Sequence, residues 1–198
     1  FVWFSSLPDR LAVPLPEGVA VMANGFPEGY TYAESFSDQG DQLVCGAKSW
    51  KVVGEAPPGG TDTVAESMDL LSSMTGMTVK PDSEVAAPAV HITFEFVSRE
   101  EIEQRSEGTG GETIGLAITT HTTFGINHSE ILLNQPFFEE ALDHNRDEAA
   151  LVVLHELGHA LGLGHTEDPE SLMHPTISAS TRITDADVVA FNAVAPDC

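Results

Sequence analysis

Basic residues are scarce in this chain. Lysine and arginine together number 8 against 31 aspartates and glutamates, which gives a formal net charge of -23 at pH 7 over 198 residues. Such a charge repels a phosphate backbone or an anionic membrane surface, so we expect neither nucleic acid nor a membrane as a partner. The acidity suits a high-salt medium, calcium or another divalent cation, or a basic substrate, and composition does not separate these. Of the three, we favour adaptation to high salt.

Long apolar runs are absent as well. No window reaches the roughly 18 apolar residues of a membrane-spanning helix, and the chain shows no leader with a basic and then an apolar stretch before a cleavage site. It begins with Phe1 instead of methionine, so we expect a processed or trimmed form that is secreted. A chain of this length is long enough for one domain with its own core, and we expect a monomer.

Cysteine is nearly absent, since only Cys45 and Cys198 occur. A disulfide between them would fasten the C-terminus to the N-terminal half and imply an oxidising, extracellular compartment. Two reduced thiols are the alternative. We favour the disulfide.

What the chain does contain is the segment His-Glu-Leu-Gly-His-Ala-Leu-Gly-Leu-Gly-His, which begins at His155. Residues four apart on a helix share a face, so His155 and His159 point the same way. Gly162 can supply the left-handed backbone that ends a helix, which leaves His165 free to approach the other two. Three imidazoles leave a fourth position for water, and zinc in such an open site lowers the pKa of that water to about 7. Glu156 is placed to accept its proton.

Two interpretations of this spacing compete. The histidines could be surface residues gathered by chance, since the chain has 8 of them. From the chain's own composition, the five fixed positions arise by chance about once in 10,000 sequences. The spacing therefore predicts one catalytic zinc site with His155, His159 and His165 as ligands and Glu156 as the base.

This segment resembles the zinc helix of the metzincin metallopeptidases, and Ser171-Leu172-Met173-His174-Pro175 resembles their Met-turn. Both segments are most similar in sequence to the matrixin branch. The resemblance implies that Met173 packs beneath the zinc and does not bind it. His174 departs from the branch, where a tyrosine commonly follows the methionine. Val44-Cys45-Gly46 also faintly resembles the Cys-Gly of a matrixin pro-segment, which would make Cys45 an inhibitory zinc ligand, but the flanking residues differ.

The resemblance implies an α+β fold: a twisted mixed sheet with a backing helix and an active-site helix, and a small C-terminal subdomain with the Met-turn and a final helix. We divide the single catalytic domain into an N-terminal extension with short strands (residues 1–60), an upper subdomain ending in the zinc helix (61–165) and a lower subdomain (166–198). Periodicity predicts strands over residues 18–22, 49–53, 90–97, 113–120 and 129–134. It predicts helices after a cap at Thr61 or Asp62 up to Gly76, over about 146–161, and from Thr184 to Ala195. Residues 99–105 are expected to be a charged, solvated stretch.

The middle of the chain resembles the matrixin edge strand, in Gly115-Leu116-Ala117, and its following bulge, in Phe124-Gly125-Ile126-Asn127. Such an edge would receive a peptide as an added strand, with Leu116 and Ala117 contacting the substrate main chain. An ordinary sheet edge is the alternative. Residues 175–180, beginning with Pro175, are expected to form a wall of the pocket for the side chain that follows the cut bond.

A second, structural zinc is not expected, because His121 and His128 alone are too few ligands. Calcium stays possible, since acidic loops are plentiful. The sequence thus predicts a zinc-dependent endopeptidase that acts on proteins or peptides. The alternatives are a zinc-containing binding module that has lost catalysis, and a zinc hydrolase of non-peptide substrates.

Overall fold

The fold was analysed in a computed structural model, which describes residues 18–22, 26–33, 46–106, 113–122 and 125–195. The predicted Cys45–Cys198 disulfide and Phe124 of the predicted bulge lie outside these residues. No helix in the described ranges is both long and apolar enough to cross a membrane.

A five-stranded sheet forms the centre of the molecule, with the strand order β2-β1-β3-β5-β4. The first four strands in this order run parallel, and β4 pairs antiparallel with β5 at the edge. The bounds are β1 (Lys48–Val53), β2 (Val79–Pro81), β3 (Val90–Val97), β4 (Gly115–Thr122) and β5 (Gly125–Asn134). The predicted mixed sheet is therefore confirmed.

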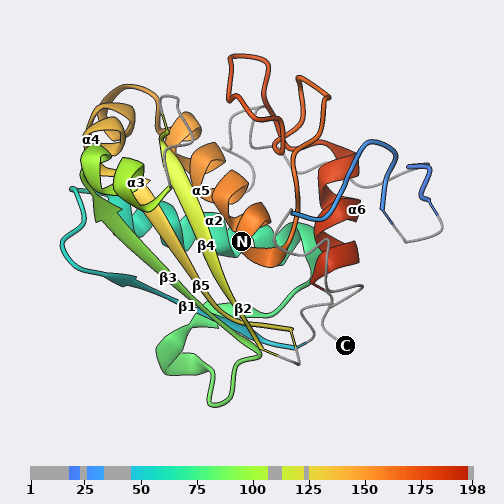
Figure 1. The fold of residues 1–198 in the computed structure, drawn as a ribbon, viewed down its shortest axis with the longest axis horizontal. Helices are drawn as coiled ribbons and strands as arrows, with labels where there is room; N and C mark the ends of the chain where they lie inside the picture. Colours follow the sequence, from blue (N-terminus) through green and yellow to red (C-terminus); the bar gives the residue numbers. More distant parts are fainter. Residues whose placement is uncertain (1–17, 23–25, 34–45, 107–112, 123–124, 196–198) are drawn as a thin grey trace.

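Two long helices, α2 (Gly60–Thr75) and α5 (Arg146–Leu161), pack together against this sheet (Figure 1). Almost the whole of α5 is buried, which confirms the prediction of a central helix over this range. The remaining helices are the single-turn η3 (Asp82–Glu84), α3 (Arg99–Arg105), α4 (Gln135–His144) and α6 (Asp185–Val194).

The two faces of the sheet bury different sets of side chains. On β5, Ile131 and Leu133 belong to the main core with α2 and α5, whereas Leu132 packs with Ile102 of α3. Successive side chains of a strand point to opposite faces, so α3 covers the face away from α5. Residues 99–105 are thus a helix, capped by the Ser98 hydroxyl, which accepts from the Glu101 amide at 3.2 Å.

The start of α2 differs from the prediction. A cap at Thr61 or Asp62 is wrong, because the N-cap is Gly59, without a side-chain hydrogen bond, at a left-handed φ of 81°. A turn at Pro57 starts the helix earlier: the Gly60 amide donates to the Pro57 carbonyl at 2.8 Å. The end at Gly76 is confirmed, with φ 76°.

The strands also depart from their predicted bounds. Residues 18–22 form no strand and contribute a single bridge, Val21 to Pro27. The strands β4 and β5 form a hairpin whose pairing extends to Thr122 and Gly125. Both strands therefore continue beyond their predicted bounds into polar sequence, where apolar and polar residues no longer alternate. The strand β1, predicted as part of an N-terminal extension, lies inside the sheet between β2 and β3.

The chain after α5 forms the small C-terminal part of the fold. Its helix α6 begins with a capping box, in which the Thr184 hydroxyl accepts from the Asp187 amide and the Asp187 carboxylate accepts from the Thr184 amide. The predicted start of this helix at Thr184 is confirmed, and the helix ends one residue before Ala195.

Candidate metal centre

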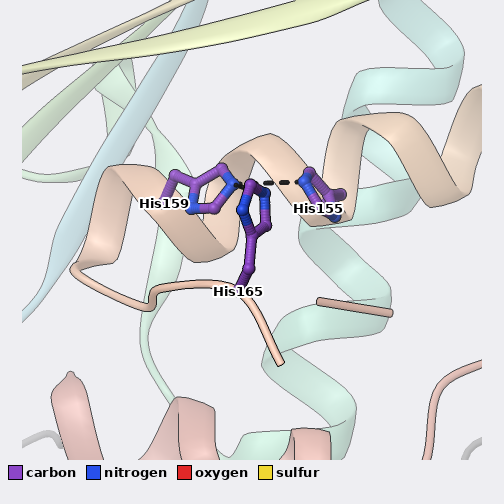
Figure 2. Close-up of side chains that lie close together, drawn as sticks. All are labelled: His155, His159 and His165. Atoms are coloured by element: carbon purple, nitrogen blue, oxygen red, sulfur yellow. Dashed lines mark hydrogen bonds between the residues drawn. The ribbon is translucent and has the colours of Figure 1, made fainter. Parts of the chain in front are cut away.

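The three predicted ligands come from α5 and the loop that follows it. His155 and His159 lie one turn apart on the helix, and His165 reaches them from the loop (Figure 2). The helix ends at Gly162, whose φ of 110° lies in the left-handed region, and its amide donates to the carbonyls of Gly158 and His159. The predicted role of Gly162 is confirmed.

The three rings point their Nε2 atoms at one another. The Nε2 of His159 lies 3.1 Å from that of His155 and 3.0 Å from that of His165. Each residue offers one nitrogen to a group whose atoms all lie within 4.8 Å of one another. Ligands of a tetrahedral zinc at a Zn–N distance of about 2.1 Å lie about 3.4 Å apart, so the spacing is close to that of one shared ion.

The tautomers of the rings favour a cation between them. The Nδ1 of His155 lies 2.7 Å from the Leu172 carbonyl, and the Nδ1 of His159 lies 2.7 Å from the Leu163 carbonyl. A carbonyl accepts only, so each Nδ1 carries the proton and each Nε2 presents a lone pair. Two Nε2 atoms that both present lone pairs have no proton to share, so their approach at 3.1 Å is not a hydrogen bond between neutral rings. A metal ion between the rings would accept both lone pairs. The residues present therefore fit zinc.

Burial keeps these imidazoles neutral. It lowers the pKa of His155 to about 3, with the neighbouring His159 adding to the effect. Burial likewise lowers the pKa of His159 to about 4. The pKa of His165, which is more exposed, is also lowered by burial and by His174. Neutral rings are the form that binds a metal, so protons compete little for the site at pH 7.

Glu156 lies beside the trio, between α5 and the edge strand, with 7% of its surface exposed. Burial raises the pKa of Glu156 to about 8, and a hydrogen bond from the Ala117 backbone acts in the opposite direction. Gly115 of β4 comes close enough that a Cβ on it would lie 2.6 Å from Oε1 of Glu156. The carboxyl group is therefore held against β4.

Met173 packs against α5 at Gly158. It is fully buried, and a Cβ placed on Gly158, which lies between the two helix histidines, would collide with its sulfur atom. The His174 amide donates to the Ser171 carbonyl at 3.2 Å, which makes Ser171–His174 a tight turn. We call these four residues the Met173 turn. The preceding Leu172 carbonyl holds the His155 ring, so the turn both supports α5 and orients a ligand.

The three residues predicted to bind substrate line one cavity of about 500 Å³ with the metal centre. Leu116 and Ala117 contribute from β4, and Pro175 contributes from the segment after the Met173 turn. The apolar side chains of Ile114, Val152 and Ile177 line the same cavity. The structure thus brings the predicted residues together.

Among the side chains that the structure describes, the trio is the one group of three or more His, Cys, Asp or Glu able to hold a metal. His174 hydrogen-bonds within its own loop, where its Nδ1 accepts from the Thr176 amide at 3.2 Å. Calcium binding stays a prediction.

Comparison with known proteins places the chain in a family. The model of the matrixins matches residues 56–194. The chain belongs to the matrixin family. It is a zinc metallopeptidase, and the family match confirms the matrixin resemblance found in the sequence.

Solved structures resemble this matrixin at low identity. Archaemetzincin from Methanopyrus kandleri is 13% identical, with 78% of this chain and 89% of that chain covered and a TM-score of 0.40. High choriolytic enzyme 1, a hatching enzyme zinc-protease from Oryzias latipes (medaka fish), is 13% identical, with 88% and 96% covered and a TM-score of 0.43.

Several residues that shape this matrixin site were missed in the sequence. Gly158 carried a signal, because it lies between two ligands one turn apart, where a small residue admits a close neighbour. Tyr30 and Asp187 hydrogen-bond to each other and to Ser171 of the Met173 turn. They are 157 positions apart in the chain, and no local pattern connects them.

Proposed function

We propose that this matrixin is an endopeptidase that hydrolyses peptide bonds of extended polypeptides, with Glu156 as its general base. The observation that carries the proposal is the convergence of three neutral imidazoles beside a buried carboxyl group in a cavity along an edge strand. A binding module needs the three histidines alone, so a base in this position favours catalysis.

His155, His159 and His165 would hold the zinc ion. Zinc on three imidazoles supplies a water molecule with a pKa near 7, and hence hydroxide at neutral pH. Leu172 and Leu163 fix two of the rings through their carbonyl groups, so little reorientation is needed when the metal binds.

Glu156 accepts the proton of the attacking water and then passes a proton to the departing amine. The shift of its pKa to about 8 reflects burial without a neighbouring cation. A divalent cation nearby favours the ionised carboxylate, which is the form that accepts a proton. Its position against β4 supports this role, because a peptide paired with β4 would lie on the same side of the cavity.

The substrate pairs with β4 as an added strand. This strand is the outermost in the sheet order, and its residues Leu116 and Ala117 line the cavity. Main-chain pairing holds any extended sequence, whereas a side-chain pocket selects among sequences. The wall from Pro175 to Ile177, together with Ile114 and Val152, suits an apolar side chain after the cut bond.

The proposal also covers the location, the oligomeric state and the subdomains of the enzyme. The enzyme is secreted, works as a monomer on protein or peptide substrates, and consists of an upper subdomain up to His165 and a lower one after it. A zinc hydrolase of non-peptide substrates is disfavoured, because an open edge strand beside the metal serves a peptide main chain best.

One assay tests the function. The purified protein is analysed for zinc and incubated with casein and with a quenched peptide, with and without a chelator, over a range of salt concentrations. We expect one zinc per chain, cleavage that stops with the chelator and returns with zinc, and internal cuts in the product masses. Zinc binding without cleavage in the parent would establish the inactive binding module instead, and hydrolysis confined to non-peptide esters would establish the third alternative.

A further inference from the structure

The segment Phe26–Ala33 packs against α6 and the loop that carries His165, although it precedes the matched matrixin residues 56–194. Phe26 and Tyr30 are buried, at 0% and 3% exposure. The ring of Phe26 packs edge-on against Tyr32, with centroids 4.6 Å apart. In Figure 1 this short blue segment runs beside the red C-terminal part of the chain. It is therefore a packed part of the domain.

The first contact of the segment is the Tyr30 hydroxyl. It donates to Oδ1 of Asp187 at 2.7 Å and lies 3.0 Å from Oγ of Ser171. Burial, and then the charge of Asp187, raise the pKa of Tyr30 far above its usual value, so the hydroxyl keeps its proton. The other oxygen of the Asp187 carboxylate accepts from the Leu172 amide at 3.1 Å.

Hydrogen bonds through Leu172 connect this contact to the predicted metal ligand His155. Leu172 donates its amide to the Asp187 carboxylate, and its carbonyl accepts from the His155 ring. The Ser171 hydroxyl in turn accepts from the Met173 amide at 2.9 Å. Tyr30 thus fixes the Met173 turn from outside, and the turn fixes His155.

The second contact is a short antiparallel pairing with the loop that carries His165. The Gly164 amide donates to the Thr31 carbonyl, and the Ala33 amide donates to the Gly162 carbonyl, both at 2.8 Å. Between these bonds Tyr32 pairs with Leu163. The approach is close, since a Cβ on Gly164 would lie 2.8 Å from the Tyr32 carbonyl oxygen.

This pairing holds the residues next to the other two predicted ligands, His159 and His165. The Leu163 carbonyl accepts from the His159 ring, and His165 directly follows Gly164. We propose that Phe26–Ala33 is a positioning element of the metal centre, with Tyr30 as its principal positioning residue, and that it sets the zinc affinity by fixing both segments that orient the three imidazoles. The proposal rests on the proposed function only for its effect on peptide cleavage, and zinc binding tests it independently.

The test is Tyr30→Phe, which removes one hydroxyl and keeps the ring. The zinc dissociation constant of the full chain is measured by competition with a chromophoric chelator. Groups that orient metal ligands typically change the affinity 10–100-fold, and we expect zinc to bind about tenfold more weakly. An affinity equal to that of the parent would overturn the proposal whether or not the protein cleaves peptides.

A matched control separates positioning from a general loss of stability. Ser67 has a buried hydroxyl that donates to the Thr63 carbonyl within α2 at 2.8 Å, so Ser67→Ala removes a comparable hydrogen bond away from the ligands. We expect it to lower the free energy of unfolding by about 1 kcal/mol, equivalent to about a fivefold change in the unfolding equilibrium, and to leave zinc affinity unchanged. Equal weakening of zinc binding in both variants would contradict a specific role of Tyr30.

A double-mutant cycle tests the route. If Tyr30 acts through the Met173 turn, Ser171→Ala should weaken zinc binding, and Tyr30→Phe added to it should weaken binding by less than it does in the parent. Strictly additive changes would mean that Tyr30 does not act through Ser171, which would overturn this branch of the proposed connection and leave the Asp187 carboxylate, which accepts from the Leu172 amide, as its route. Peptide cleavage is measured alongside: an inactive parent with the expected zinc results contradicts only the proposed function.

Discussion

Gly115 and Glu156 are in such close contact that a methyl group on Gly115 would lie 2.5 Å from Cγ of Glu156 and 2.6 Å from its Oε1. One residue belongs to the edge strand and the other to the zinc helix, so the strand that is proposed to bind substrate also sets the position of the proposed base. A shift of either one moves the other.

Gly115→Ala tests this relationship. The added methyl group forces the carboxyl group away from β4, and a displacement of about 1 Å at a catalytic group costs on the order of 100-fold in rate. We expect kcat for a quenched peptide to fall by roughly this factor while zinc content stays at the parent value, because no zinc ligand is touched. Loss of zinc together with activity would show that the substitution disturbs α5 itself.

The pH dependence of stability tests the burial of Glu156 in the metal-free protein. Its pKa rises on folding from 4.5 to about 8, so the folded state keeps a proton that the unfolded state releases. The stabilising effect of this proton is complete below pH 4.5 and is lost as the pH rises through about 8. Removal of the ionisable group should therefore stabilise the protein only at the higher pH.

We expect Glu156→Gln to be more stable than the parent by at least about 2 kcal/mol at pH 8, since each pKa unit corresponds to about 1.4 kcal/mol, and nearly equal to it at pH 4.5. Urea unfolding in the presence of a chelator measures both. His155 and His159 change stability in the opposite direction, since their lowered pKa values destabilise the fold as the pH falls below 6.5, but they do so in both proteins. A difference that is the same at the two pH values would contradict the pKa shift of Glu156.

Met173 tests the packing beneath the helix. Truncation of a fully buried side chain leaves a cavity, so Met173→Ala should lower the free energy of unfolding by about 2–5 kcal/mol. Met173→Leu keeps the volume and should cost less than about 1.5 kcal/mol. Thermal or urea unfolding checks both values, and similar losses for the two variants would mean that volume is not what Met173 supplies.

The parts of the fold that the sequence predicted are those with local signals. The spacing of His155, His159 and Gly162 follows from helix geometry alone, and the capping box at Thr184 is a signal within four residues. The helix α4 was missed although Asn134 caps it, with its side chain accepting from the Phe137 amide at 3.2 Å, and a proline stands in its first turn. Both signals stand at the end of β5 or directly after it.

Other features had no local signal at all. The strand β2 is three residues long and exists through its pairing with β1. The contact of Tyr30 with Asp187 joins two ends of the chain, so it depends on the complete tertiary fold. The predicted substrate contacts at Leu116, Ala117 and Pro175 follow from the family resemblance, and the structure places these residues around one cavity.

The most direct measurement of the central claim is the coordination of zinc in the zinc-loaded protein, by X-ray absorption at the zinc edge or by a crystal structure with anomalous scattering. We predict three imidazole nitrogens at about 2.0–2.1 Å, from His155, His159 and His165, with an oxygen ligand in the fourth position, and loss of the ion in each single His→Ala variant. A zinc ion held by fewer than these three rings, or a zinc-loaded protein in which the rings point apart, would contradict the account.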